Sequence, residues 1–134
     1  MSDKSIERLK DKVRELTRRN RGVKFELVIK ELNQVIIGWT NYFRLANVWL
    51  ATIRDMDGWI RRKARCYRFK QCGRRYTIFK LLHCLGIPER KSWNAIMYSQ
   101  GWWQLSKKTA VGHAMNLEWF SRQGLLSLYL RMTV

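Results

Sequence analysis

Apolar side chains recur at steps of three and four residues through the first part of the chain, which is the spacing of one face of an α-helix. In residues 3–19 the apolar positions are Ile6, Leu9, Val13 and Leu16. A longer stretch, from about Phe25 to Arg44, repeats the pattern at Phe25, Val28, Leu32, Val35, Trp39 and Tyr42. We therefore predict two amphipathic helices. The second is the most apolar, so it is expected at the centre of a helical bundle.

A third helix is expected over residues 55–70, with Asp55 or Asp57 as its N-terminal cap. At about 100° per residue, four arginines of this helix fall within roughly 60° of arc. This arginine stripe consists of Arg54, Arg61, Arg65 and Arg68. Since no acidic residue accompanies these arginines on the helix face, we predict that the stripe is unneutralised and contacts phosphate groups.

Shorter elements are predicted after Gly73, with helices over 76–85, 91–98 and 110–122. The tail, 125–134, is compatible with a strand or a last helix. The predicted fold is all-α: a three-helix bundle over 1–72 and a small helical C-terminal subregion over 73–134. Gly22 is expected to supply a left-handed helix cap. Gly38 lies inside the second helix, and we expect a backbone or a bulky ring to approach it closely.

Composition points to a polyanionic partner. The chain of 134 residues has a hydrophobic fraction of 46% and seven tryptophans, enough to form a core. It carries 27 Lys and Arg against 10 Asp and Glu, a net charge of +17. No acid lies between Asp57 and Glu89. We therefore predict a nucleic-acid-binding face. No signal peptide or membrane span is apparent, so we expect a cytoplasmic protein that does not bind membranes.

Catalytic and metal-binding patterns are weak. Asp55 and Asp57 are the only close carboxylate pair that could serve a two-metal site, and helix capping explains them better. Cys66, Cys72 and Cys84 lack paired zinc-binding spacing, and His83 next to Cys84 points to another side of its helix. We predict no catalytic residues, no bound metal and no cofactor. The role of the three thiols stays open.

Two strings of residues resemble a known family, the maturase-specific domain of group II intron-encoded reverse transcriptases, also called domain X or the thumb. The resemblance is carried by Leu32, Asn33, Gly38, Trp39, Asn41, Tyr42 and Phe43. Residues 16–22 and 57–62 follow the family's pattern in the same order. Residues 85–87, 99–106 and 123–128 also look like the segment that follows the thumb in some bacterial members.

The resemblance implies a thumb-like helical bundle that binds group II intron RNA and assists splicing. In full-length relatives the thumb also grips a primer–template duplex. The expected partners are intron RNA or other structured RNA, an RNA–DNA duplex, and palm and fingers domains or a second copy of the chain. The implied location is the bacterial cytoplasm. The chain has no adjacent Asp-Asp pair, so we do not expect polymerase chemistry from it alone.

Two alternatives stay open. The chain could be a general nucleic-acid-binding or self-associating module, or a reverse transcriptase fragment that is active only with its palm and fingers. The predicted RNA contacts are Arg18, Arg19, Arg21, Arg54, Arg61, Arg62, Arg65, Arg68, Lys70, Arg74, Arg75, Lys107 and Lys108. Trp102 and Trp103 could pack in the core or stack on bases. The family-motif residues are expected to be structural first and RNA-contacting second.

Overall fold

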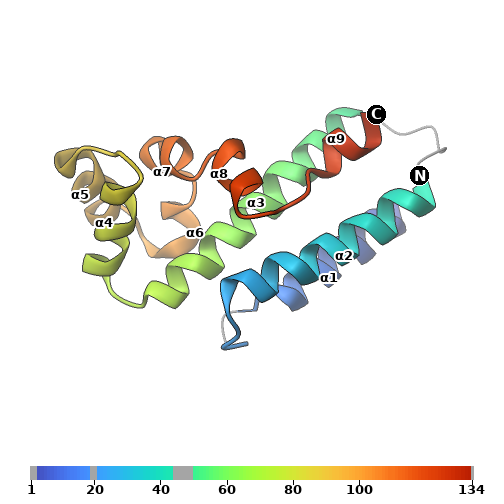
Figure 1. The fold of residues 1–134 in the computed structure, drawn as a ribbon, viewed down its shortest axis with the longest axis horizontal. Coiled ribbons are helices and arrows are strands. Elements are labelled where there is room, and N and C mark those ends of the chain that lie inside the picture. The colour runs from blue at the N-terminus through green and yellow to red at the C-terminus, as the bar shows by residue number, and fades with distance from the viewer. Residues whose placement is uncertain (1–2, 19–20, 44–49, 134) are drawn as a thin grey trace.

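The fold is built from helices throughout the described ranges, 3–18, 21–43 and 50–133 of a computed structural model (Figure 1). Three long helices come first: α1 (Asp3–Leu16), α2 (Phe25–Phe43) and α3 (Leu50–Cys72). Six shorter ones follow: α4 (Arg75–Cys84), α5 (Glu89–Met97), α6 (Gly101–Leu105), α7 (Thr109–Ala114), α8 (Leu117–Arg122) and α9 (Leu128–Thr133). The predicted all-α class is confirmed. None of the helices within these ranges is long and apolar enough to cross a bilayer.

The first three helices form the predicted bundle, in which α1 packs against both α2 and α3. Leu9 and Val13 of α1 are buried, as are Val28 and Leu32 of α2. The predicted apolar face of α2 is wrong at Tyr42, whose side chain is 82% exposed. At that end of α2 the buried positions are Ile36 and Thr40, one turn apart, so the core-facing side has turned away from Tyr42.

The third helix begins earlier than predicted, at Leu50 rather than near Asp55. Ile53, Met56 and Ile60 are all buried, so the apolar face of α3 extends back into its first turn. Asp57 therefore lies inside the helix and cannot cap it. Instead its carboxylate accepts hydrogen bonds from Leu128 N and Ser127 Oγ, at 2.9 and 2.8 Å. Asp57 thus satisfies the first free amide of α9, a helix that begins 71 residues further on.

The C-terminal half folds back on α3 (Figure 1). Helices α4 and α6 pack against α3, while α5 and α7 pack around α4. The last helix, α9, lies along α3 and α2 near the end of the bundle that holds both termini (Figure 1). The buried side chains of this half join the same core as the bundle residues, and they include Ile78, Leu82, Leu105, Met115, Phe120 and Leu128. A boundary after Cys72 stays a prediction, and the core continues across it.

The structure also answers three other local expectations, on a helix break, the C-terminal tail and a glycine cap. The helix predicted over 110–122 is in fact α7 and α8, because Asn116 Oδ1 accepts from Trp119 N at 2.8 Å and starts a new helix. The undecided tail is helical from Leu128. Gly22 has the expected left-handed backbone, with φ of 68°.

The expectation for Gly38 was wrong. A methyl group built on its Cα would meet no atom within 4 Å beyond its immediate helical surroundings, and the residue is exposed. The neighbouring aromatic residues suggested a close approach, but α2 turns this side of its last turns to solvent.

Candidate nucleic-acid interface

The arginine stripe of α3 points largely into the protein rather than into solvent. Arg65 donates from Nε and Nη2 to the backbone carbonyl of Met115, at 3.0 and 2.7 Å. Its guanidinium also lies over the ring of Phe120, 5.5 Å from the centroid. Burial, together with the neighbouring charge of Arg61, lowers the pKa of Arg65 to about 10. Arg65 therefore bonds α3 to the segment between α7 and α8.

Arg61 has an acidic partner, which corrects the expectation that the stripe is unneutralised. Its Nη1 lies 2.6 Å from Asp57 Oδ2, and the Asp57 side chain is only 8% exposed. As a helix cap, Asp57 would have bonded to backbone amides and not to Arg61, so the sequence did not indicate this pair. In a longer α3 the two residues are one turn apart on the same face. Arg68, at the end of the stripe, donates to Cys72 Sγ at 3.5 Å.

Arg54 and Arg62 also bond to the C-terminal half. Arg54 is exposed, and its Nη2 donates to the hydroxyl of Tyr129 at 3.0 Å. Arg62 donates to Ser106 Oγ and to the carbonyl of Trp103, at 3.0 and 2.8 Å. Its guanidinium lies 3.5 Å from the centroid of the Trp103 ring. Donors that the prediction assigned to phosphate are thus engaged within the protein.

One family-motif residue, Asn33, is bonded to the segment that follows α8. Asn33 donates from Nδ2 to Gly124 O at 2.7 Å and accepts at Oδ1 from Leu126 N at 2.8 Å. Both polar atoms of one side chain therefore pair with one stretch of backbone, as in a strand pairing. Leu32 beside it is fully buried, whereas the motif residues Gly38, Asn41 and Tyr42 are exposed.

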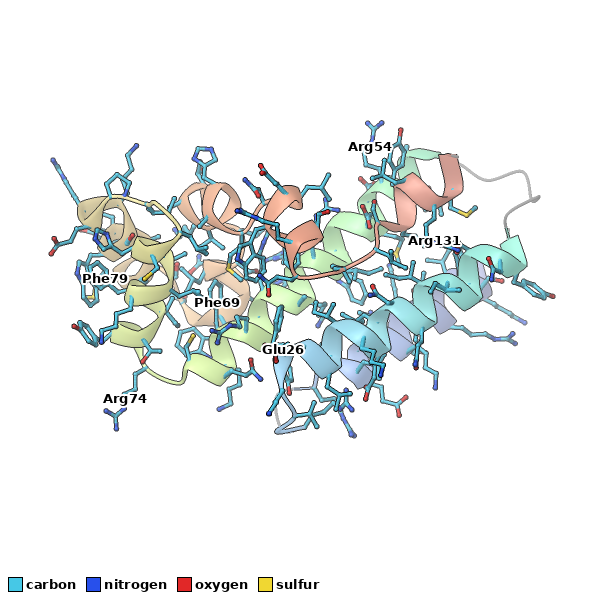
Figure 2. All side chains as sticks on the ribbon, in the orientation of Figure 1. Glu26, Arg54, Phe69, Arg74, Phe79 and Arg131 are labelled. Atoms are coloured by element: carbon cyan, nitrogen blue, oxygen red, sulfur yellow. The ribbon has the colours of Figure 1, made fainter. Side chains whose placement is uncertain are left out.

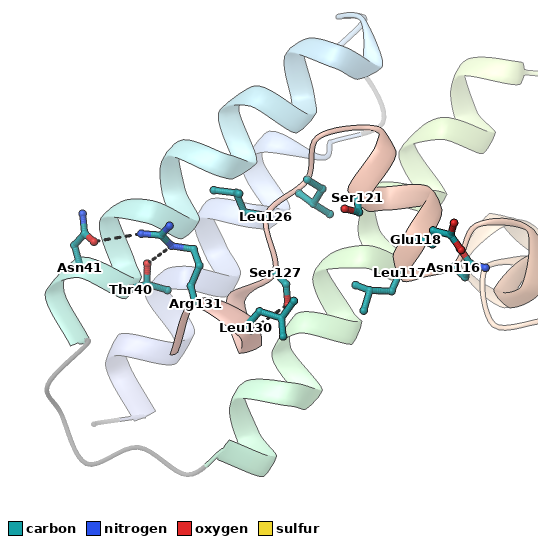
Figure 3. Close-up of a pocket in the computed structure, with 11 residues that line it drawn as sticks. Thr40, Asn41, Asn116, Leu117, Glu118, Ser121, Leu126, Ser127, Leu130 and Arg131 are labelled. Carbon is teal, nitrogen blue, oxygen red and sulfur yellow. Dashed lines mark hydrogen bonds between the residues drawn. The ribbon is translucent and has the colours of Figure 1, made fainter. Parts of the chain in front are cut away.

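The end of α2 is bonded to α9 by an arginine that the sequence analysis did not single out. Arg131 donates from Nε to Thr40 Oγ1 at 3.0 Å and from Nη2 to Asn41 Oδ1 at 3.4 Å (Figure 3). No periodicity marks Arg131, because its partners are 90 or more residues away. The bonds lie beside a groove of about 900 Å³, whose lining includes the exposed side chains of Leu117 and Leu130.

Cations that do face solvent gather where the α1–α2 turn meets the end of α3. Tyr67 Oη accepts from Val23 N at 3.1 Å and donates to Val23 O at 2.5 Å. Gln71 Nε2 donates to the same carbonyl at 2.8 Å. These bonds hold the turn against α3, and a hollow of about 350 Å³ remains, with Lys24 and Lys70 both in its lining.

We call the exposed residues Lys24, Lys70, Arg74 and Arg75 the basic corner. Arg74 and Arg75 follow Lys70 across the bend at Gly73, and Arg74 points away from the molecule (Figure 2). Among the described residues, none of the four has an acidic oxygen within 4 Å. Lys24 was missed by the sequence analysis. The one signal in the sequence was that a lysine stands directly before α2, where Ser, Thr, Asp or Asn would cap the helix better.

The remaining predicted contacts differ in their surroundings. Arg21 forms a two-point ion pair with Glu31, at 2.6 and 3.1 Å, and this hydrogen bonding lowers the pKa of Glu31. Arg18 and Lys107 are exposed, and Lys108 is half-buried. Arg19 lies outside the described residues, and so does the side chain of Phe43. Of the two tryptophans, Trp102 packs against the core and Trp103 is partly exposed beside Arg62.

No group of three or more His, Cys, Asp and Glu side chains within the described ranges is placed to hold a metal ion. Cys66, Cys72 and Cys84 are free thiols. Burial raises the pKa of the Cys72 thiol, and the nearby Arg68 partly opposes this. His83 Nδ1 lies 3.2 Å from the carbonyl of Ile87, a contact local to the end of α4.

Comparison with known proteins places these features in a family. The sequence model described as "Group II intron, maturase-specific domain" matches residues 6–82, more than half of the chain. The match spans most of α1, all of α2 and α3 and most of α4, and so includes nearly the whole bundle and the basic corner. No curated protein matches the chain. The resemblance noted at the LN and GWTNYF strings is confirmed, and the function is related to group II intron maturases. The chain belongs to the group II intron maturase-specific domain family.

Proposed function

We propose that this chain binds group II intron RNA through the basic corner and thereby assists the folding that splicing requires. The observation that supports the proposal most directly is the contrast between two sets of cations. The arginines of the α3 stripe, and Arg62 beside it, are hydrogen-bonded to groups within the protein, whereas Lys24, Lys70, Arg74 and Arg75 are exposed and lie away from acidic side chains in the described structure.

The physical basis is the release of counterions from the RNA backbone. Each protein cation that neutralises a phosphate makes the plot of log K against log salt concentration steeper, by about 0.7 to 0.9 in its slope. Among the arginines of α3, Arg61 is neutralised by a carboxylate, and the others keep their charge but direct N–H donors at protein groups, so they have fewer donors available for a phosphate oxygen. The basic corner rather than the arginine stripe is therefore the proposed contact surface.

The test removes the four charges of the basic corner with Lys24→Gln, Lys70→Gln, Arg74→Gln and Arg75→Gln in one variant. A matched control removes four exposed charges elsewhere, with Lys4→Gln, Arg8→Gln, Lys12→Gln and Lys30→Gln. Both variants carry the same net charge. Binding to a folded group II intron RNA is measured by filter retention over a range of salt concentrations.

We expect the corner variant to lose at least tenfold in affinity relative to the control, with a salt slope smaller by about three because four cations are removed. Equal losses in both variants would mean that only net charge matters, and the site would be refuted. Unrelated duplex RNA and DNA serve as competitors. Equal affinity for all three would favour the general nucleic-acid module over an intron-specific function.

The proposal extends to the primer–template duplex where such a domain is joined to palm and fingers. A duplex presents the same phosphate backbone to the basic corner, so the corner variant should also weaken binding of an RNA–DNA duplex. Splicing itself is assayed with the same intron RNA at low magnesium. There the intact chain should accelerate the reaction and the corner variant should not.

A further inference from the structure

The pair formed by α4 and α5 carries a row of aromatic rings. Tyr76, Phe79 and His83 follow one another along α4 at helical steps of three and four. Their planes are nearly parallel: 25° between Tyr76 and Phe79 and 9° between Phe79 and His83, with centroids 6.2 and 5.7 Å apart. Trp93 of α5 stacks on Phe79 at 4.5 Å and 12°. We call these four residues the ring row.

The ring row is supported from inside and open at both ends. Phe79 and Trp93 are half-buried and pack against the hydrophobic core, which holds the row in place. Tyr76 is 57% exposed, and His83 is also exposed. Phe79 lies between α4 and α5 at the end of the molecule remote from both termini (Figure 2). The row therefore offers two accessible rings on a rigid base.

Positive charge surrounds the row. Lys80 Nζ lies 4.9 Å from the centroid of the Tyr76 ring. Arg74 and Arg75 are exposed at the start of α4, and Arg90 and Lys91 are exposed at the start of α5. Residues 73–98 carry these five cations against a single acid, Glu89. An apolar protein partner would bury cations without neutralising them, so the charge favours a polyanion over a protein.

We propose that the ring row binds an unpaired nucleotide strand, with bases stacked on Tyr76 and His83 and phosphates beside Lys80 and Arg75. Aromatic rings interleaved with cations bind single strands because every base has a π-face and every phosphate a charge. In a duplex the faces of the bases are already covered by their neighbours, so the rings would have nothing to stack on. The inference rests on the proposed function and adds to it the unpaired segments of the bound nucleic acid.

The experiment uses the intact chain and three fluorescein-labelled probes of about 12 nucleotides, a length that spans sites of this type. They are oligouridylate, oligothymidylate and an oligomer of the same phosphate number that lacks bases. The test variant is Tyr76→Ala with His83→Ala. The control is Tyr98→Ala, which removes a ring that directly follows α5, is 76% exposed and lies outside the row. Tyr76→Phe keeps the ring and should keep the binding.

Fluorescence anisotropy at fixed salt should show that the double variant loses at least about tenfold in affinity for the unpaired probes, since stacking accounts for roughly that factor per ring. Tyr98→Ala should change the affinity less than twofold. The abasic oligomer should bind weakly and equally to all variants. Oligouridylate and oligothymidylate together show whether the strand is RNA, DNA or either.

Two results would overturn the inference: abasic and base-containing probes that bind alike, or a double variant that binds unpaired probes as the intact chain does. Thermal unfolding of each variant confirms that a loss of binding is not a loss of folding. If oligouridylate and oligothymidylate do not bind, while the basic corner variant still binds folded intron RNA more weakly than the intact chain does, only this inference is refuted. If folded intron RNA does not bind at all, the proposed function falls first.

Discussion

Arg65 in the middle of α3 donates two hydrogen bonds to the carbonyl of Met115, which ends α7 fifty residues later. A carbonyl at a helix end lacks the amide donor of a continuing helix, so it accepts a side-chain cation favourably. The same guanidinium was a strong candidate for phosphate contact by its place in the arginine stripe. The Arg65 side chain thus connects α3 to the end of α7, and its charged group is hydrogen-bonded to a backbone carbonyl.

Arg65→Met should therefore affect stability rather than RNA affinity. Loss of a charge-assisted hydrogen bond to the buried Met115 carbonyl should lower the free energy of unfolding by about 2 kcal/mol, as measured in urea. Arg54→Met, at an exposed position of the same helix, should change it by less than about 1 kcal/mol. A stable Arg65→Met protein with weakened RNA binding would restore Arg65 to the RNA interface.

Asn33→Ala should loosen the segment from Gly124 to Leu126. It removes both hydrogen bonds of the side chain and leaves Gly124 O and Leu126 N without these partners, at a cost of about 1 to 3 kcal/mol. Hydrogen exchange of the Leu126 amide should become much faster. Gln34→Ala, at the next and exposed position, serves as the control and should leave that amide protected. An unchanged exchange rate in Asn33→Ala would show that the segment is held by its apolar packing alone.

The Arg21–Glu31 pair predicts a pH-dependent contribution to stability. Because the pKa of Glu31 is lowered in the folded protein, its contribution is present above the ordinary carboxyl pKa of about 4.3 and is lost as the pH falls through the lower folded value. Glu31→Gln should cost about 1 kcal/mol at pH 7 and less at pH 3, below the ordinary carboxyl pKa. Glu26→Gln, at an exposed position of the same helix, should cost little at either pH. A Glu31→Gln penalty that is the same at both pH values would contradict the ion-pair assignment.

Gly38→Ala should raise stability by about 1 kcal/mol, because the position is inside α2, exposed and open enough for a methyl group. Gly86→Ala makes the opposite control, since Gly86 has φ of 96° and an alanine there would be strained. Melting temperatures of the two variants should move in opposite directions. If Gly38→Ala instead weakens intron RNA binding without loss of stability, the residue is kept small for a partner that contacts α2.

Local patterns predicted the helical part of the fold because they depend on neighbours in sequence. Leu9, Val13, Val28 and Leu32 repeat at helical spacing, and all four are buried as that spacing requires. The same reasoning failed where a helix end depends on distant contacts. Asp57 is a residue type that commonly caps helices, and it does accept from a free helix amide. That amide belongs to Leu128 of α9, however, and the spacing of residues in the sequence does not show that α9 packs beside Asp57.

By itself the sequence determined the all-helical class, the excess of positive charge and the family, because composition, periodicity and motif strings are properties of contiguous residues. Only the tertiary structure decided which cations are available. Whether the guanidinium of Arg65 meets the carbonyl of Met115 or solvent depends on how the C-terminal half folds over α3. Charge is counted along the chain, but neutralisation is a matter of distance in space, since Coulomb and hydrogen-bond energies fall steeply with separation.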